Sequence, residues 1–169
     1  MEAQQRQKGF TIIEALVAIA IISLAMVVPL TLSRQSLSAM TRVRNYITAT
    51  YLAQEGVELV HYLRDSNMIE EEDWLSGIDA CYGDGCMIDP SSLTITPCSG
   101  ACDPMEHDAS AGEYSYSGDM ETMFTRTIIL TPIGSDGEGP YEVEVSSVVT
   151  FPFKGRTQQA QLLEHIHRW

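Results

Sequence analysis

The sequence has few basic side chains. Its 169 residues include 10 lysines and arginines against 23 aspartates and glutamates, giving a net charge of −13. Binding to nucleic acid needs a basic surface, and so does docking on anionic lipid by charge alone, so this balance argues against both. The chain is nevertheless 44% hydrophobic, which is too apolar for a disordered protein. Its length fits one ordinary domain, or a small domain with an appended element.

The sequence also lacks a pattern typical of an enzyme. No Ser/His/Asp, Cys/His, phosphate-loop or paired-carboxylate arrangement stands out, so we expect no catalytic activity. His165 and His167 would share one face of a strand and are candidates for chelating a metal, but such a pair is more often simply exposed. We therefore predict no metal site at these histidines.

Hydrophobic residues gather in one long run, Phe10–Leu32, which contains one charge, Glu14, and one proline, Pro29. As a helix the run would be about 34 Å long at ~1.5 Å per residue, enough to cross a bilayer core of roughly 30 Å. A core helix that is apolar on every side needs a large protein around it. The run therefore predicts a membrane-spanning or targeting segment, which Pro29 should kink.

Beyond Leu32 the apolar residues thin out, but a helical pattern continues. We expect one helix from Phe10 to Asp65, transmembrane over residues 10–32 and amphipathic afterwards, because no proline lies between Thr31 and Ile88. Apolar residues recur on this second part at steps of three, four or eight: Leu37, Met40, Val43, Ile47, Tyr51, Leu59 and Leu63. Residues 10–65 carry no net charge, whereas residues 66–169 carry 18 acidic and four basic side chains. The acidity therefore belongs to the C-terminal part.

The C-terminal part, residues 66–169, is predicted to be a globular acidic head. Residues 66–112 look irregular, with short strands possible at residues 92–96 and 113–117. The β-branched stretch at residues 124–133 and the period-two alternation of residues 141–153 predict an antiparallel hairpin around a turn at residues 134–140. Residues 156–169 would form a last strand, although residues 160–166 are also compatible with a short helix. The apolar face of such a sheet needs a cover, and the amphipathic half of the helix is the candidate. The expected fold class is α+β.

The residues around the start resemble a known processing site. The segment Lys8-Gly9-Phe10-Thr11-Ile12-Ile13-Glu14 looks like that of type IV prepilins and type II secretion pseudopilins, which have a short polar leader ending in glycine and a glutamate shortly afterwards. The resemblance implies that residues 1–9 are a leader, that prepilin peptidase cuts between Gly9 and Phe10, and that Phe10 becomes N-methylated. Glu14 would then attract the N-terminal ammonium of an adjacent subunit during assembly.

The resemblance also implies a location and partners. Before assembly the protein would span the inner membrane once, with Arg6 and Lys8 on the cytoplasmic side and the head outside the cytoplasm. It would then enter a cell-surface or periplasmic filament. Its partners would be prepilin peptidase, other pilin or pseudopilin subunits and an inner-membrane assembly platform. Arg34, Arg42 and Arg44 lie beyond the apolar run, so the distribution of positive charge does not itself fix this orientation.

A glutamate inside an apolar helix needs a reason. A carboxylate at mid-bilayer costs on the order of 2.5 kcal/mol or more, so Glu14 should be paired, near the interface, or functional. One alternative role is to favour the helix N-terminus through the backbone dipole. The N-terminus as a whole is also open to interpretation as a secretory signal cleaved near residues 36–38, or as a plain membrane anchor. The first of these fits poorly, because a signal's apolar region is shorter and tolerates no internal acid well.

The four cysteines and the surrounding acids lie in the loop region. If the head is outside the cytoplasm, disulfides are the default; Cys81–Cys86 with Cys98–Cys102 is the simplest of three connectivities. A zinc site is the weaker alternative for the same four residues. Some pseudopilins are stabilised by calcium, but the acids here show no calcium-loop register, and a solvated surface is the better explanation. These acids are Asp79, Asp84, Asp89, Asp103, Asp108, Asp136 and Glu138.

The sequence thus predicts a pilin-like structural subunit of a type IV pilus (fimbrium) or a related filament. A type II secretion pseudopilin is the first alternative. A membrane-anchored extracytoplasmic binding domain that never polymerises is the second. Replacing Glu14 with alanine should abolish incorporation into a filament in the first two cases and change little in the third.

Overall fold

The structure is a computed structural model that describes residues 9–137 and 139–168; of Val28, it describes the backbone alone. Residues 1–8 of the predicted leader (residues 1–9) lie outside the described residues, as do Glu138 and Trp169. The chain divides into two compact units, one reaching to Val43 and one comprising Arg44–Trp169. Within the described residues, one long helix, a short 3-10 turn and two antiparallel sheets make up the secondary structure, so the predicted α+β class is confirmed.

Helix α1 comprises Ile12–Ile69 and begins two residues later and ends four residues later than predicted. The Asp65-Ser66-Asn67 segment does not end it, because these residues keep helical hydrogen bonding; the Ser66 carbonyl accepts the Glu70 N–H at 3.0 Å. The end comes before Glu71, whose φ of 60° is left-handed, as is common just past a helix C-terminus. The Asn67 amide nitrogen donates to the Ser76 carbonyl at 2.9 Å and ties the following loop to the helix.

The first unit contains the apolar part of α1. Among the described residues, α1 is the one helix long and apolar enough to cross a membrane, and none of its most apolar 18-residue stretch is buried within the protein. The Ser23 and Ser33 hydroxyls each donate to the carbonyl four residues earlier, at 2.8 Å. These two hydroxyls therefore satisfy their hydrogen bonding within the helix, as a lipid environment requires. The helix continues through Pro29, and the predicted kink there stays a prediction.

The second unit contains a five-stranded sheet in the order β2-β1-β6-β7-β8. Its long strands are β6 (Thr125–Asp136), β7 (Gly139–Phe153) and β8 (Arg156–His167), which confirms the predicted hairpin and the last strand, and excludes the short helix at residues 160–166. The predicted turn at residues 134–140 is shorter, because β6 and β7 extend into it. Register shifts at Pro132, Gly134 and Ser135 allow this pairing despite the proline and glycines.

Short strands fill the loop region that the sequence predicted as mostly irregular. The remaining members of the first sheet are β1 (Cys86–Ile88) and β2 (Ile95–Pro97), which pair antiparallel after the 3-10 turn η1 (Ile78–Cys81). A second sheet has the order β4-β3-β5, formed by β3 (Glu106–Asp108), β4 (Glu113–Ser115) and β5 (Met120–Glu121). The strands predicted at residues 92–96 and 113–117 correspond to β2 and β4.

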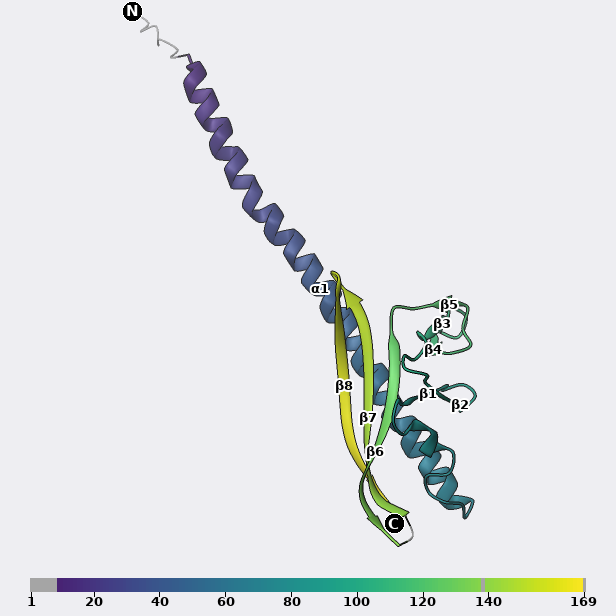
Figure 1. Ribbon diagram of the computed structural model, residues 1–169. Helices are drawn as coiled ribbons and strands as arrows, with labels where there is room; N and C mark the ends of the chain where they lie inside the picture. Colours follow the sequence, from purple (N-terminus) through teal and green to yellow (C-terminus); the bar gives the residue numbers. More distant parts are fainter. Residues whose placement is uncertain (1–8, 138, 169) are drawn as a thin grey trace, which may run out of the picture. The chain divides into compact units, whose positions relative to one another are not determined.

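The part of α1 that begins at Arg44 lies across one face of the five-stranded sheet (Figure 1). The predicted contact face was right only at its C-terminal end, where Leu59 and Leu63 are partly buried against the core. It was wrong at Ile47 and Tyr51, which are 49% and 68% exposed, and the earlier Leu37, Met40 and Val43 are exposed too. The helix instead buries a face of mainly small residues, which lets the two backbones approach closely: Ala49, Leu52, Ala53, Gly56, Val57 and Val60. Large side chains at these positions would hold the helix away from the sheet.

The sheet contributes the alternating face that its sequence predicted. Val143, Val145, Ser147, Val149 and Phe151 of β7 are all buried, at 0–1% exposure. They help to form two core clusters, one around Val57, Val60 and the disulfide of η1, and one around Ala49, Ala53 and the Phe124–Phe151 ring pair. The helix is thus fixed to the sheet over several turns.

Candidate assembly site

Glu14 lies in the first turn of α1, immediately after the predicted processing site. Gly9 and Phe10 precede the helix, and both are exposed, Phe10 by 78%. The Thr11 carbonyl accepts the Glu14 and Ala15 N–H groups at 3.1 Å, and the Thr11 hydroxyl accepts the Glu14 N–H at 3.3 Å. Thr11 therefore caps the helix, and the Gly9–Phe10 bond lies in accessible, non-helical backbone, where a peptidase can reach it.

The Glu14 carboxylate is exposed, and none of the residues 9–137 and 139–168 forms an ion pair with it. Its place in the first turn is electrostatically favourable, since the helix N-terminus carries partial positive charge. That interaction alone is worth roughly 0.3–1 kcal/mol, less than the cost of an unpaired carboxylate deep in a bilayer. A cation supplied from outside the chain would therefore stabilise Glu14 in lipid.

A buried arginine, which the sequence analysis did not single out, fixes α1 to the sheet. Arg126 of β6 is 0% exposed, and one guanidinium nitrogen donates to Glu55 Oε2 at 2.6 Å and to the Leu52 carbonyl at 3.2 Å. The other donates to the Ile88 carbonyl of β1 at 2.8 Å. One side chain thus links the helix, β1 and β6.

A sequence signal for this arginine exists. Arg126 lies two and four residues before Ile128 and Leu130 in β6, so the three side chains point to the same face of the strand, and both apolar residues are buried. This alternation places the arginine on the core face of the sheet, where its buried charge needs an acidic partner from the element that covers the sheet. Glu55 is the acid of α1 that meets it.

The four predicted cysteines form two local disulfides in the structure, Cys81–Cys86 and Cys98–Cys102. This is the simplest of the three connectivities, and no free cysteine is left for zinc within the described residues. The first disulfide joins η1 to β1 and is fully buried. The second closes the loop after β2.

The acidic loop residues do not converge. Within the part of the chain that the structure describes, no group of three or more His, Cys, Asp or Glu side chains is arranged to hold a metal. Asp89 and Asp108 instead order their own turns, each accepting bonds from the backbone and hydroxyl of the serine two residues later. Burial alone would raise the pKa of Asp89, but the Ser91 and Ser92 bonds outweigh it and lower the pKa below its usual value.

The predicted histidine pair lies at the exposed end of β8. The His165 ring contacts the neighbouring strand: Nδ1 lies 2.8 Å from Glu142 and Nε2 lies 3.6 Å from Glu144. The hydrogen bond to Glu142 raises the pKa of His165. His167 has Glu142 opposite it on β7. The acidic neighbours thus bind His165 as an ion-pair partner.

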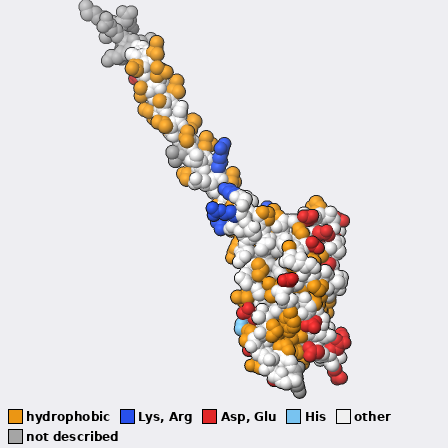
Figure 2. Space-filling view, in the orientation of Figure 1, with side chains coloured by type: hydrophobic (Ala, Val, Ile, Leu, Met, Phe, Trp, Pro, Cys, Tyr) orange, Lys and Arg blue, Asp and Glu red, His pale blue; other side chains and the backbone are white. Residues whose placement is uncertain are grey.

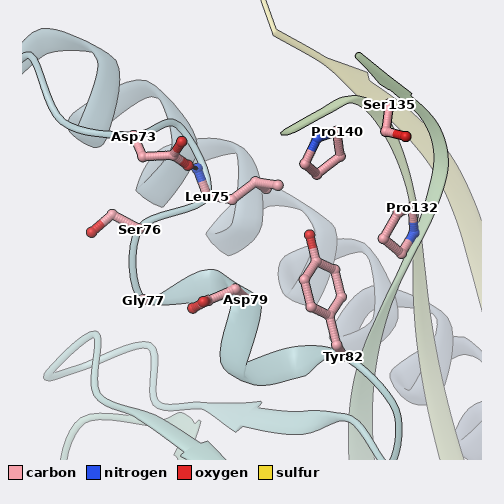
Figure 3. Close-up of a pocket in the computed structure, with 9 residues that line it drawn as sticks. All are labelled: Asp73, Leu75, Ser76, Gly77, Asp79, Tyr82, Pro132, Ser135 and Pro140. Carbon is pink, nitrogen blue, oxygen red and sulfur yellow. Dashed lines mark hydrogen bonds between the residues drawn. The ribbon is translucent and has the colours of Figure 1, made fainter. Parts of the chain in front are cut away.

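An open pocket of about 590 Å³ lies between the loop after α1 and the β6–β7 turn (Figure 3). The Tyr82 ring forms one wall, and its hydroxyl, directed between Leu75 and Pro140, has no hydrogen-bond partner among the described residues. Burial and then the Asp79 and Asp73 charges raise the pKa of Tyr82, so the phenol stays protonated at neutral pH. The pocket carries no nucleophile–base pair. Its lining is Asp73, Leu75, Ser76, Gly77, Asp79, Tyr82, Pro132, Ser135 and Pro140.

Comparison with known families identifies the N-terminus. Residues 4–28 match the family model of the prokaryotic N-terminal methylation motif, the signature of type IV pilins and pseudopilins. No curated protein and no solved structure matches the chain. The motif indicates a prepilin-peptidase substrate that assembles with other pilin subunits, and together with the long apolar helix it fits a membrane-anchored pilin. Members of this class are usually structural subunits rather than enzymes.

Proposed function

We propose that this protein is a pilin-like structural subunit which prepilin peptidase cuts between Gly9 and Phe10 and methylates at Phe10. The observation that carries the proposal is the methylation motif over residues 4–28, which continues into the exposed, apolar start of α1 at Ile12. The accessible backbone at Gly9 and the capped helix start at Thr11 support cleavage at this position.

Assembly follows from the chemistry of the new terminus. Cleavage gives Phe10 a free ammonium, and this is the external cation that Glu14 requires. Two unit charges about 4 Å apart interact by roughly 4 kcal/mol at an effective dielectric constant of 20, and by more as water is excluded. Glu14 of one subunit therefore attracts the terminus of a neighbour, and the pair is more stable between helices than either charge is alone in lipid.

The two units of the chain have different roles in this scheme. The apolar first unit anchors the protein in the inner membrane and then bundles with copies of itself in the filament core. The second unit lies outside the cytoplasm, where its disulfides persist. Residues 66–169 carry 18 acidic and four basic side chains, and Figure 2 shows acids gathered mostly along one edge of this unit. The filament surface is therefore acidic and binds no nucleic acid directly. No cofactor takes part.

The N-terminus of the protein extracted from its native membrane tests this proposal. We expect a mature chain that begins at N-methylated Phe10, and an intact mass lower by the nine leader residues. Glu14→Ala should leave processing intact and abolish incorporation into filaments. Glu121→Ala, which removes an exposed acid in β5, is the matched control and should assemble normally.

Other outcomes of these experiments would assign the protein to a different class. A chain that still begins at Met1 indicates a plain membrane anchor, and one that begins near Ala39 indicates a secreted domain; either result refutes the proposal. Normal behaviour of Glu14→Ala would point to a binding domain that never polymerises. A type II secretion pseudopilin shares the motif and the assembly mechanism. Whether a pilus or a type II secretion system requires the protein distinguishes the two.

A further inference from the structure

The second unit leaves one side of its helix uncovered. Ile47, Tyr51 and Tyr62 are 49%, 68% and 58% exposed. At ~100° per residue these three positions lie within about 60° of one another around the helix. The opposite side carries Ala49, Ala53 and the other small residues that pack on the sheet. We call the uncovered side, over residues 44–62, the outer stripe.

Two unpaired charges lie on the outer stripe. Arg44 and Glu58 are exposed, and among the residues that the structure describes neither has an ion-pair partner. Arg44 and Glu58 are 14 residues apart in the sequence. At ~100° and ~1.5 Å per residue, this is a rotation about 40° short of four full turns and a rise of about 21 Å, so both residues lie on the same side of the helix. Glu55, the other acid near the stripe, is already bound to Arg126.

We propose that Arg44 of one copy pairs with Glu58 of a second copy, in the same orientation and displaced along the helix by 14 residues. The inference rests on the proposed function, which places all copies in one membrane and therefore makes their helices parallel. Burying the outer stripe against a second copy removes water from both charges, and a buried charge without a partner is strongly unfavourable.

The offset follows from the charge pattern. With no displacement, Arg44 would face Arg44 and Glu58 would face Glu58, so both contacts would be repulsive. A displacement of about 21 Å brings unlike charges together and leaves Ile47 and Tyr51 in the contact. The second copy is therefore a different neighbour from the one whose terminus Glu14 attracts, because that pair needs a displacement of only about 6 Å. Because each copy then offers one arginine in one direction and one glutamate in the other, the contact repeats without closing, as a filament requires.

Charge reversal tests the pair in the native host, with the full chain. Arg44→Glu and Glu58→Arg should each reduce the assembled fraction of the protein at least tenfold, measured as filament sheared from cells relative to membrane-bound subunit. The double variant restores the pair in reverse and should recover assembly to within about twofold of wild type. Arg156→Glu and Asp84→Arg, which change the charge equally at exposed positions away from the stripe, should have no effect.

The outcomes separate this inference from the proposed function. If wild-type protein is processed and assembles, but the two single reversals behave like their controls, the inference is wrong and the proposed function stands. If wild-type protein is neither processed nor assembled, the proposed function itself fails. Equal unfolding midpoints for all variants show that the head still folds.

A crosslinking measurement checks the direction of the contact. Ile47→Cys/Tyr62→Cys, which keeps both charges and places the two thiols 15 residues apart on the outer stripe, should give a ladder of multimers on a gel when filaments are treated with a short thiol-specific crosslinker. A product that stops at the dimer would indicate an antiparallel pair, because two antiparallel helices satisfy both contacts at once. That result, or the absence of any crosslink in intact filaments, overturns the proposal.

Discussion

Gly56 lies where α1 packs closely on β6 and β7, and adding one methyl group there tests that packing. A Cβ at this position would overlap Ser147 Oγ and lie 3.1 Å from Arg126 Cδ. Arg126 cannot move aside easily, because its guanidinium makes three hydrogen bonds that link α1, β1 and β6. Gly56→Ala therefore inserts volume into a place where neither neighbour has free space.

The magnitude is a difference between two effects. Alanine favours a helix by about 0.8–1 kcal/mol over glycine. Overpacking a close-packed interior costs about 1–3 kcal/mol, and the overlap with both Ser147 and Arg126 places this site in the upper part of that range. We expect Gly56→Ala to lower the free energy of unfolding by about 1–2 kcal/mol.

A second substitution identifies the source of the loss. Ser147 Oγ is buried and has no hydrogen-bond partner among the described residues, so Ser147→Ala should be neutral or slightly stabilising by itself. It also removes the atom that the new methyl group overlaps. The double variant should therefore recover about 1 kcal/mol of the loss, which a double-mutant cycle reports as a coupling energy.

Urea unfolding of the full chain in detergent, followed by the fluorescence of buried Trp74, measures these free energies. Gln54→Gly, at an exposed helix position, calibrates the propensity effect and should cost about 1 kcal/mol. If Gly56→Ala is more stable than wild type by a similar amount, the helix and sheet are not in close contact at this point, and the reasoning is refuted.

Three further predictions concern the same unit. Arg126→Ala should destabilise the protein by about 2–5 kcal/mol in the same urea assay, since it empties a buried volume and leaves the Leu52 and Ile88 carbonyls unpaired, while the freed Glu55 is 41% exposed. Arg126→Met refills the volume and should cost less; equal losses would show that the volume of the side chain contributes nothing. An NMR titration should find the pKa of His165 above its ordinary value, and Glu142→Gln should lower that pKa. The His165–Glu142 pair contributes stability fully below the unfolded-state pKa, and this contribution is lost as the pH rises through the raised folded-state pKa. A stability gain from this pair at higher pH would contradict the assignment. Cys81→Ser/Cys86→Ser should lower the free energy of unfolding by about 2 kcal/mol, as loop-closure entropy predicts for so short a loop, and reductant should then affect only the Cys98–Cys102 pair.

Local patterns predicted the strands well, because a strand shows its buried face directly in the sequence. The alternation along Tyr141–Phe153 is the clearest case: β7 buries the alternate residues from Val143 to Phe151, whereas Tyr141 at the end of the strand is 45% exposed. The helix was harder, since a helix with two apolar sides does not show which side meets the sheet. Ile47 and Tyr51 are larger than Ala49 and Ala53, but the sheet takes the small side because it permits close approach.

The candidate sites also differ in how well the sequence predicted them. The methylation motif was predictable because it is contiguous and a charge in an apolar run is conspicuous, while the cleavage point at Gly9 and the role of Glu14 stay predictions. Arg126 and Glu55 are 71 residues apart, and only the fold brings them together. The sequence analysis assigned Ile47 and Tyr51 of the outer stripe to the core face. The stripe could be considered as a contact surface only once the structure placed these residues on the outside of the helix.

The order of the elements along the chain also governs the order of their synthesis. Ala49 shares a core cluster with Val149, Phe151 and Ala160, so the partners of the helix emerge from the ribosome roughly 100 residues after the helix itself. At ~5–20 residues per second this is a delay of about 5–20 s, during which α1 has both of its apolar sides exposed. The nascent helix is thus vulnerable to aggregation until β7 and β8 arrive, and its translocation must protect it for that time.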